Sequence, residues 1–162
     1  MKVIIVDKED NVIGSKEREL VKQEDIYRVS SLWIMNSKNE FLLARRALSK
    51  TNDPGKWGPA VAGTIEEGET YGSNIIKEAE EELGLTDIKL TKGPKRFHKG
   101  KHNFFYQWFF LRIDKMIEEF SIQKDEVEEI KWISKTDLLK AIRKRPDEFL
   151  DGVAYCAQNF YF

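Results

Sequence analysis

The chain has 162 residues, a length typical of one domain, and we expect a single domain over residues 1–162. Its formal net charge of −1 gives no reason to expect nucleic acid or an anionic membrane as a partner. The only cysteine, Cys156, excludes an intrachain disulfide. No apolar run approaches the length of a membrane span or of a signal-peptide core, so we expect a cytoplasmic protein.

Two β-hairpins are predicted in the first third of the chain, the first of them within residues 1–20. Each consists of two runs rich in strand-forming residues that flank a short polar turn. The four strands are Lys2–Asp7, Val12–Arg18, Val29–Met35 and Phe41–Arg46. A polar loop follows, and a short apolar strand over Trp57–Ala62 is predicted after it.

The rest of the chain alternates between helical and extended patterns. In chain order the expected elements are a helix over Thr70–Leu83 that ends at Gly84, strands over Ile88–Phe97, Phe104–Ile113 and Val127–Ile133, a helix from Ser134 to Lys144, and a last helix from Pro146. Hairpins mixed with three helices predict an α/β fold in which helices cover a mixed sheet.

Three glutamates of the first predicted helix lie close together around its axis. Glu81 and Glu82 are about 60° and 40° from Glu78, so the three carboxylates share one stripe. We expect four apolar residues to occupy the opposite arc and to pack on a sheet: Ile75, Ile76, Ala79 and Leu83. Like charges at this spacing repel, and a hard divalent cation such as Mg²⁺ or Mn²⁺ would offset the repulsion. The alternative is a solvated helix face.

The residues around these glutamates match the Nudix box. In words, the box is Gly, five residues, Glu, seven residues, Arg-Glu, an apolar residue, any residue, Glu-Glu, any residue, Gly, and an apolar residue. Within residues 63–85 the matching positions are Gly63, Glu69, Glu78, Ala79, Glu81, Glu82, Gly84 and Leu85. Lys77 departs from the box, which has Arg there. Six fixed matches arise by chance at roughly 10⁻⁵ for a chain of this length.

The chain therefore resembles the Nudix superfamily, and the resemblance implies an α/β/α sandwich with a mixed sheet. It also implies that Glu78 and Glu82 are the principal metal ligands and that the carbonyl of Gly63 completes the ligand set. Glu81 would share a metal ion or position the attacking water. These roles imply a Mg²⁺- or Mn²⁺-dependent enzyme.

Two further box residues would support the site. Glu69 would pair with the basic residue at position 77 and hold the loop against the helix. Lys77 keeps the positive charge of the family's arginine but loses its two-pronged geometry. We therefore expect weaker preorganisation of the loop without loss of function.

Three residues outside the box are also candidates. Glu126 precedes Trp132 by six residues, in a region where many Nudix enzymes place an additional metal ligand or general base; an exposed glutamate without a role is the alternative. Arg46 and Lys50 would clamp the phosphates, or be solvated loop charges. Arg45 is less favoured, because strand alternation points it away from Arg46.

Other segments resemble the isopentenyl-diphosphate isomerase branch of the superfamily. They are Leu42–Lys50, Pro54–Trp57, and Asp125–Val127 followed by Trp132. That branch has a catalytic cysteine just before the box glycine and a metal-binding histidine just after it, where this chain has Ala62 and Thr64. Its Glu-x-Glu pair corresponds to residues 102–104, which read His-Asn-Phe. An allylic proton shift without its acid and base is chemically unfavourable.

The sequence thus predicts a hydrolase that cleaves a diphosphate linkage in a nucleoside diphosphate derivative or similar small molecule. The alternatives are an isomerase-like enzyme and a non-catalytic nucleotide-binding module. A basic stretch, Lys92–His102, would steer a polyanionic substrate or contact RNA, and the alternative is a soluble turn. The N-terminal hairpin would serve a homodimer, as the resemblance implies.

Overall fold

The computed structural model describes residues 1–160, so the last two positions of the expected domain lie outside the described residues. The strands are β1 (Lys2–Val6), β2 (Val12–Glu17), β3 (Ile26–Met35), β4 (Glu40–Arg46), β5 (Trp57–Gly58), β6 (Val61–Thr64), β7 (Thr91–His98), β8 (Asn103–Arg112) and β9 (Val127–Ser134). The helices are α1 (Tyr71–Leu83), α2 (Lys135–Lys144) and α3 (Val153–Asn159), with 3₁₀ turns at η1 (Arg18–Leu20), η2 (Ile117–Glu119) and η3 (Pro146–Glu148).

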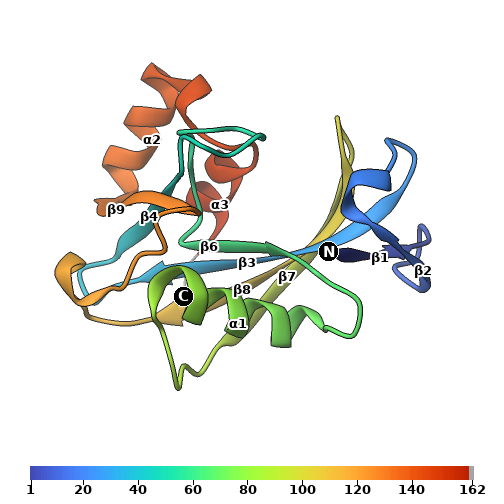
Figure 1. Ribbon diagram of the computed structural model, residues 1–162. Helices are drawn as coiled ribbons and strands as arrows, with labels where there is room; N and C mark the ends of the chain where they lie inside the picture. The colour runs from blue at the N-terminus through green and yellow to red at the C-terminus, as the bar shows by residue number, and fades with distance from the viewer. Residues whose placement is uncertain (161–162) are drawn as a thin grey trace.

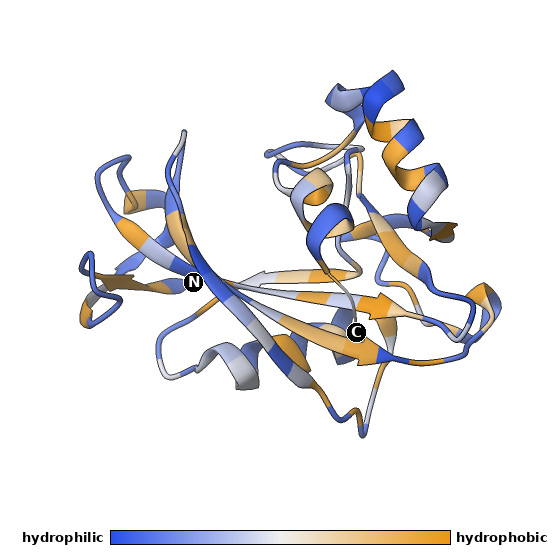
Figure 2. Cartoon of the chain, turned by 180° about the vertical axis from the view of Figure 1, so that it is seen from behind, coloured by the Kyte–Doolittle hydropathy of each residue, from blue (hydrophilic) through white to orange (hydrophobic). Residues whose placement is uncertain are grey.

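The strands form one mixed sheet with helices on both faces, which confirms the predicted α/β sandwich and its N-terminal hairpin. Helix α1 lies on one face, and α2 and α3 lie on the other (Figure 1). Figure 2 shows hydrophobic residues gathered along the central strands between these layers and hydrophilic residues at the hairpin loops. No helix within residues 1–160 is long and apolar enough to cross a membrane.

Strand β3 organises the sheet. One of its edges pairs in parallel with β8 along the full strand. The other edge is shared in turn by β1 at Ile26–Tyr27, by β6 at residues 29–32 and by β4 at Ile34–Met35. Beyond this last pairing β4 diverges from β3 and pairs with β5 at Ala44 and Arg45, while β9 pairs with β4 along its whole length. The divergence leaves an opening in the sheet between β4 and β6.

The predicted strand Trp57–Ala62 is divided at this opening. Its first residues form β5 on β4, and the chain then crosses to form β6 on β3. Pro59 lies at the crossing, where its missing amide N–H removes a donor that a continuous strand would need. One short apolar run therefore spans both sides of the opening.

Two large apolar cores lie on the two sheet faces, and a smaller cluster contains Ile4, Val6 and Ile65. The core under α1 includes Leu32, Ile34, Ile75, Ala79 and Leu83, each 0% exposed. The core under α2 and α3 includes Trp33, Phe41, Trp108, Leu138 and Cys156. Neighbouring residues of β3 enter different cores because side chains alternate between the faces of a strand.

The predicted helix from Pro146 is wrong in one respect, because it is interrupted. A 3₁₀ turn over Pro146–Glu148 ends before α3 begins at Val153. Between them the Leu150 N–H donates to the Trp57 carbonyl at 2.8 Å, and Phe149 is buried at 5% exposure. Gly152 has a φ of 87°, a left-handed conformation that a continuous helix excludes. Burial of Phe149 against β5 thus outweighs local helix propensity.

The turn of the N-terminal hairpin is anchored by Asp10. Its carboxylate accepts from Arg28 Nε at 2.7 Å, from Lys95 Nζ at 2.5 Å and from the Tyr71 hydroxyl at 3.1 Å. These partners belong to β3, β7 and α1, so one buried carboxylate ties the hairpin to three elements. Lys95, one cation of the predicted basic stretch, therefore has a structural partner.

Candidate active site

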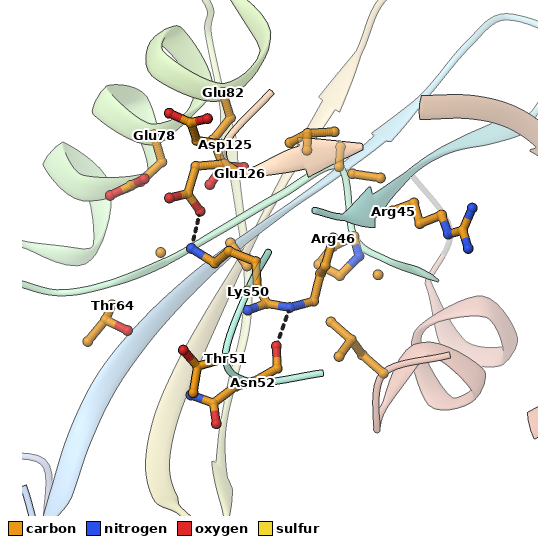
Figure 3. A pocket seen from close by; sticks show the side chains of 18 of the residues that line it. Arg45, Arg46, Lys50, Thr51, Asn52, Thr64, Glu78, Glu82, Asp125 and Glu126 are labelled. Atoms are coloured by element: carbon orange, nitrogen blue, oxygen red, sulfur yellow. Dashed lines mark hydrogen bonds and ion pairs between the residues drawn. The ribbon is translucent and has the colours of Figure 1, made fainter. Parts of the chain in front are cut away.

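A pocket of about 530 Å³ lies at the opening between β4 and β6. Acidic and basic side chains face one another in it (Figure 3). The acidic residues of its wall are Glu66, Glu78, Glu82, Asp125 and Glu126. The basic ones are Arg18, Arg45, Arg46 and Lys50. Gly63 also lines the pocket, so most of the predicted site residues share one cavity.

Helix α1 turns its glutamates toward the sheet to different extents. Glu82 is only 8% exposed, because it lies about 20° around the helix from the fully buried Ile75. Glu78 is half-buried at the border of this face, whereas Glu81 is exposed and lies outside the pocket wall. Ile76, expected to pack on the sheet, is 48% exposed. The expected division of the helix into an acidic stripe and an opposite apolar arc is therefore wrong, because the buried face includes both Ile75 and Glu82 and excludes Ile76.

Burial dominates the electrostatics of these carboxylates. It raises the pKa of Glu82 to about 8, and the charges of Glu78 and Glu126 add to the rise. Burial also raises the pKa of Glu78, against the opposing effect of Lys77. Each carboxylate would hold its negative charge more easily beside a cation.

Lys77 is the cation nearest to the box carboxylates. Its Nζ lies 2.6 Å from Glu69 Oε1, 3.1 Å from Glu66 Oε1 and 3.7 Å from Glu78 Oε1. The pKa of Glu69 is lowered, because hydrogen bonds from Lys77, the Glu66 N–H and Asn74 outweigh the effect of burial, which would raise it. The structure thus places Glu69 and Lys77 where the sequence-based interpretation pairs them, with Glu66 as an additional partner.

Asn74 is a site residue that sequence reasoning missed. It is 0% exposed, and its Nδ2 donates to Glu69 Oε2 at 2.8 Å and to the Thr64 carbonyl at 3.2 Å. Its Oδ1 accepts from the Ser30 hydroxyl of β3. The available signal was its position one helical turn before Glu78, on the same side of α1. Asn74 fastens the loop after β6 to both α1 and the sheet.

Two of the pocket cations come from β4 and the loop after it, as predicted. Arg46 Nε donates to the Asn52 carbonyl at 3.0 Å, and Lys50 Nζ donates to Glu126 Oε2 at 2.5 Å (Figure 3). The backbone also brings these segments together, since the Ala47 N–H donates to the Glu126 carbonyl at 2.9 Å. Arg46, Lys50 and Glu126 therefore occupy one wall of the pocket.

The remaining two cations differ in orientation. Arg45 points away from the carboxylates (Figure 3), and its guanidinium donates to the Gly55 carbonyl and to Glu129. Arg18, which the sequence did not single out, donates to the Thr64 hydroxyl at 2.7 Å. The end of the N-terminal hairpin thus contributes a cation to the pocket.

The donor set suits a hard divalent cation. Glu78, Glu82 and Glu126 offer carboxylate oxygens, the ligands that Mg²⁺ and Mn²⁺ prefer. Within residues 1–160, no three His, Cys, Asp or Glu side chains lie close enough as they stand to hold one ion. These carboxylates fit such an ion in chemistry and charge. In the structure the ammonium group of Lys50 forms an ion pair with Glu126.

Comparison with known proteins supports a shared ancestry. The NUDIX domain family model matches residues 26–153. An uncharacterized Nudix hydrolase of Pseudomonas aeruginosa is 31% identical over 142 residues, which cover 87% of this chain and 83% of that protein. An isopentenyl-diphosphate Delta-isomerase of Enterobacter sp. (strain 638) is 28% identical, with coverage of 97% and 89%. Both relatives match over most of their own length.

Solved structures show the same fold. The crystal structure of DR0079 from Deinococcus radiodurans superposes with a TM-score of 0.85 at 21% identity and covers 100% of both chains. The family match extends from β3 to the start of α3 and so includes the box and most of the residues that line the pocket. The chain therefore belongs to the Nudix hydrolase family, whose enzymes generally cleave diphosphate linkages.

Proposed function

We propose that this protein is a divalent-metal-dependent hydrolase that cleaves the diphosphate linkage of a nucleoside diphosphate derivative. The observation that carries the proposal is the pocket in which the buried Glu82 and half-buried Glu78 face Arg46 and Lys50. A diphosphate needs cations on its oxygens, and Mg²⁺ or Mn²⁺ needs carboxylate oxygens as ligands. The pocket offers both within one cavity.

The residues of the pocket would divide the work. Glu78 and Glu82 would hold Mg²⁺ or Mn²⁺, with the Gly63 carbonyl beside them and Glu81 as an outer ligand recruited from the exposed side of α1. Such an ion, when bound, neutralises phosphate charge and makes a bound water more acidic. Arg46 and Lys50 would bind the phosphate oxygens and stabilise the leaving phosphate. Glu126 would accept the proton of the attacking water.

Glu69 and Lys77 would act indirectly, by holding the metal ligands in position. Their ion pair, with Asn74, holds the loop that follows Gly63 and β6 against the helix that carries Glu78. Groups that orient metal ligands typically affect activity by about 10–100-fold. Neither residue would touch the substrate.

Isomerase chemistry is the alternative, and the 28% identity to the Enterobacter isomerase favours it. It would need an acid and a base beside the allylic carbon. The chain's only cysteine, Cys156, lies in α3 outside this pocket, and burial raises the pKa of its thiol to about 12. A thiol held neutral and outside the pocket would be a poor proton-transfer group, so we favour hydrolysis.

The test is ³¹P NMR of a panel of nucleotides, nucleotide sugars, dinucleoside polyphosphates and prenyl diphosphates, with Mg²⁺ and with Mn²⁺. Glu82→Gln should reduce turnover by more than about 100-fold, beyond the typical effect of a positioning residue. Glu80→Gln is the matched control, because Glu80 is exposed on the same helix and absent from the pocket wall. Full activity of Glu82→Gln would overturn the proposal. Ligand binding without turnover would instead indicate a binding module.

A homodimer through the N-terminal hairpin belongs to the same proposal. Val12 and Ile13 of β2 are 56% and 66% exposed, and large apolar side chains on a sheet edge favour association. Light scattering should give twice the monomer mass, and Ile13→Lys should return the monomer. A monomeric wild-type protein at micromolar concentration would contradict the dimer.

A further inference from the structure

A second pocket, of about 510 Å³, adjoins the carboxylate pocket. The two share a short ridge of residues that line both: Thr51, Asn52, Pro59, Ala62 and Leu150. A molecule with its diphosphate in the first pocket would therefore place the attached group across this ridge. We refer to the second cavity as the aromatic pocket, after its residues Trp33, Phe104, Tyr106 and Trp108.

The floor of the aromatic pocket is the face of β3 and β8 that points away from α1. The parallel register sets Val29 beside Tyr106 and Ser31 beside Trp108. Along β8, the rings of Phe104 and Tyr106 meet edge-to-face at 5.8 Å, and those of Tyr106 and Trp108 meet at 4.3 Å. Tyr106 remains half-buried. Such a row of rings suits a flat aromatic heterocycle, which gains by stacking or edge contact.

Polar groups on this floor lack partners. The Ser31 side chain lines the pocket at 7% exposure, and its hydroxyl makes no hydrogen bond with residues 1–160. The indole Nε1 of Trp33 is also without a hydrogen-bond partner in the described part of the chain. A hydrocarbon placed over Ser31 would seal its hydroxyl from water unsatisfied, which is unfavourable. An occupant with polar ring edges would satisfy it.

Basic residues form part of the wall of the aromatic pocket. The turn between β7 and β8 contributes His98, Lys99, Lys101 and His102 to the wall. The rings of His98 and Phe104 stack with their centroids 4.6 Å apart. An aromatic ring of the pocket floor thus also packs against this turn. Arg96, by contrast, lies over Tyr155 at 4.1 Å. The part of the basic stretch that borders the pocket is therefore its tip, where it would attract a phosphorylated ligand.

These observations lead to one assignment. We propose that the aromatic pocket binds the nucleobase of the substrate, with Tyr106 supplying the ring contact and Ser31 a hydrogen bond to the base edge. The assignment rests on the proposed function, because it presumes that the diphosphate lies in the adjoining pocket. It makes Tyr106 and Ser31 the residues that select a nucleoside over a prenyl chain.

The test is equilibrium binding measured by calorimetry in the presence of EDTA, so that no turnover occurs. The probes are AMP, GMP, CMP, UMP and, as the prenyl counterpart, dimethylallyl monophosphate. At least one nucleotide should bind the wild-type protein. Tyr106→Leu should weaken that binding by about 5- to 100-fold, the range typical of losing one base–aromatic stack. Ser31→Ala should change the order of preference among the four bases.

Phe97→Leu is the matched control, because Phe97 is an aromatic residue of the neighbouring strand that is 45% exposed and lies outside the pocket wall. It should bind like the wild type, and thermal unfolding should show that all three variants are folded. Equal nucleotide affinity of wild type and Tyr106→Leu would overturn the assignment. So would binding of the prenyl phosphate in preference to every nucleotide.

The same variants separate this inference from the proposed function. A nucleotide that binds through Tyr106, in a protein that hydrolyses nothing in the panel, would overturn the hydrolase and leave the pocket assignment intact. Nucleotide hydrolysis that Glu82→Gln abolishes, with a KM unchanged by Tyr106→Leu and Ser31→Ala, would do the reverse.

Discussion

Gly63 and Glu78 lie so close together that no side chain fits between them. A Cβ at position 63 would lie 2.6 Å from Glu78 Cγ and 2.9 Å from its Cδ. Asn74 Oδ1 would lie 2.7 Å away. The first residue of the Nudix box is thus glycine because β6 and α1 approach each other here, and the approach sets the direction of the Glu78 carboxylate.

Gly63→Ala should therefore damage the site more than the fold. The added methyl group must displace Glu78 or Asn74, and overpacking of this kind costs about 1–3 kcal/mol of stability. We expect turnover to fall by at least about 10-fold, as for loss of a residue that orients metal ligands. Steady-state kinetics and thermal unfolding would measure both effects. Unchanged turnover in the folded variant would contradict the role of this contact.

Glu82 should lower the stability of the metal-free protein. Its pKa is raised from 4.5 in the unfolded chain to about 8 in the folded protein. The free energy of unfolding is therefore highest below pH 4.5 and falls as the pH rises toward 8, because the folded protein then has to hold a buried negative charge. Glu82→Gln removes the ionisable group. In EDTA at pH 8 the variant should therefore melt above the wild type, with about 2–4 °C for each kcal/mol regained. At pH 4 the difference should vanish, and a variant that melts lower at pH 8 would refute the argument.

Lys77 offers a test of positioning by a single charge. Lys77→Met removes the ion pairs to Glu69 and Glu66 and should reduce turnover by about 10–100-fold. Lys77→Arg restores the residue of the family's box and should retain or raise activity. Because neither change touches the substrate, the loss should appear in kcat or in the apparent metal affinity. A Lys77→Met enzyme with wild-type kinetics at limiting Mg²⁺ would exclude the positioning role.

Asp10 should control acid stability. Burial alone would raise the pKa of its carboxyl, but hydrogen bonds and charges from Lys95 and Arg28 outweigh burial and lower that pKa below 3.8. Its contribution is thus complete above pH 3.8 and is lost as the pH falls through the lower folded-state value. Asp10→Asn should cost about 2–3 kcal/mol at pH 7, less than a fully buried pair, because Lys95 is 43% exposed. Asparagine also tolerates the φ of 66° at this position.

Urea unfolding at pH 7 and at pH 3 would test this expectation. The wild type and Asp10→Asn should differ at pH 7 and converge toward pH 3. Glu9→Gln is a suitable control, because Glu9 is an exposed residue of the same turn. If the two proteins differed in stability by the same amount at pH 7 and at pH 3, the effect would come from packing and not from charge.

The sequence predicted the elements whose signals are local. The helix limits follow from Thr70, which accepts from the Ser73 N–H, and from Gly84, which has a φ of 67°. The division of Trp57–Ala62 and the break before α3 depend on pairing with distant strands, which local patterns do not encode. The closeness of Glu82 to Ile75 follows from 100° per residue, whereas the pocket that Glu82 faces exists only because β3 and β4 diverge.

The box indicated most of the candidate site, but not the residues that it recruits from elsewhere. Arg18 reaches Thr64 from the N-terminal hairpin, 46 positions away along the chain. Ser30 and Asn74 are ordinary polar residues in sequence and become informative only when both are seen at 0% exposure and in contact. Long-range contacts of this kind have no periodicity that a single sequence reveals.

Ser30 and Ser31 are neighbours on β3 that serve opposite faces of the sheet. Ser30 braces Asn74 beneath the helix of the box, and Ser31 lies on the floor of the aromatic pocket. Deleting or inserting one residue upstream in β3 would exchange the two faces, because side chains alternate strictly along a strand. Substitutions can therefore accumulate on either face independently, whereas changes in strand length would disrupt both at once. Relatives that differ in substrate should vary in residue identity along β3 and keep its length.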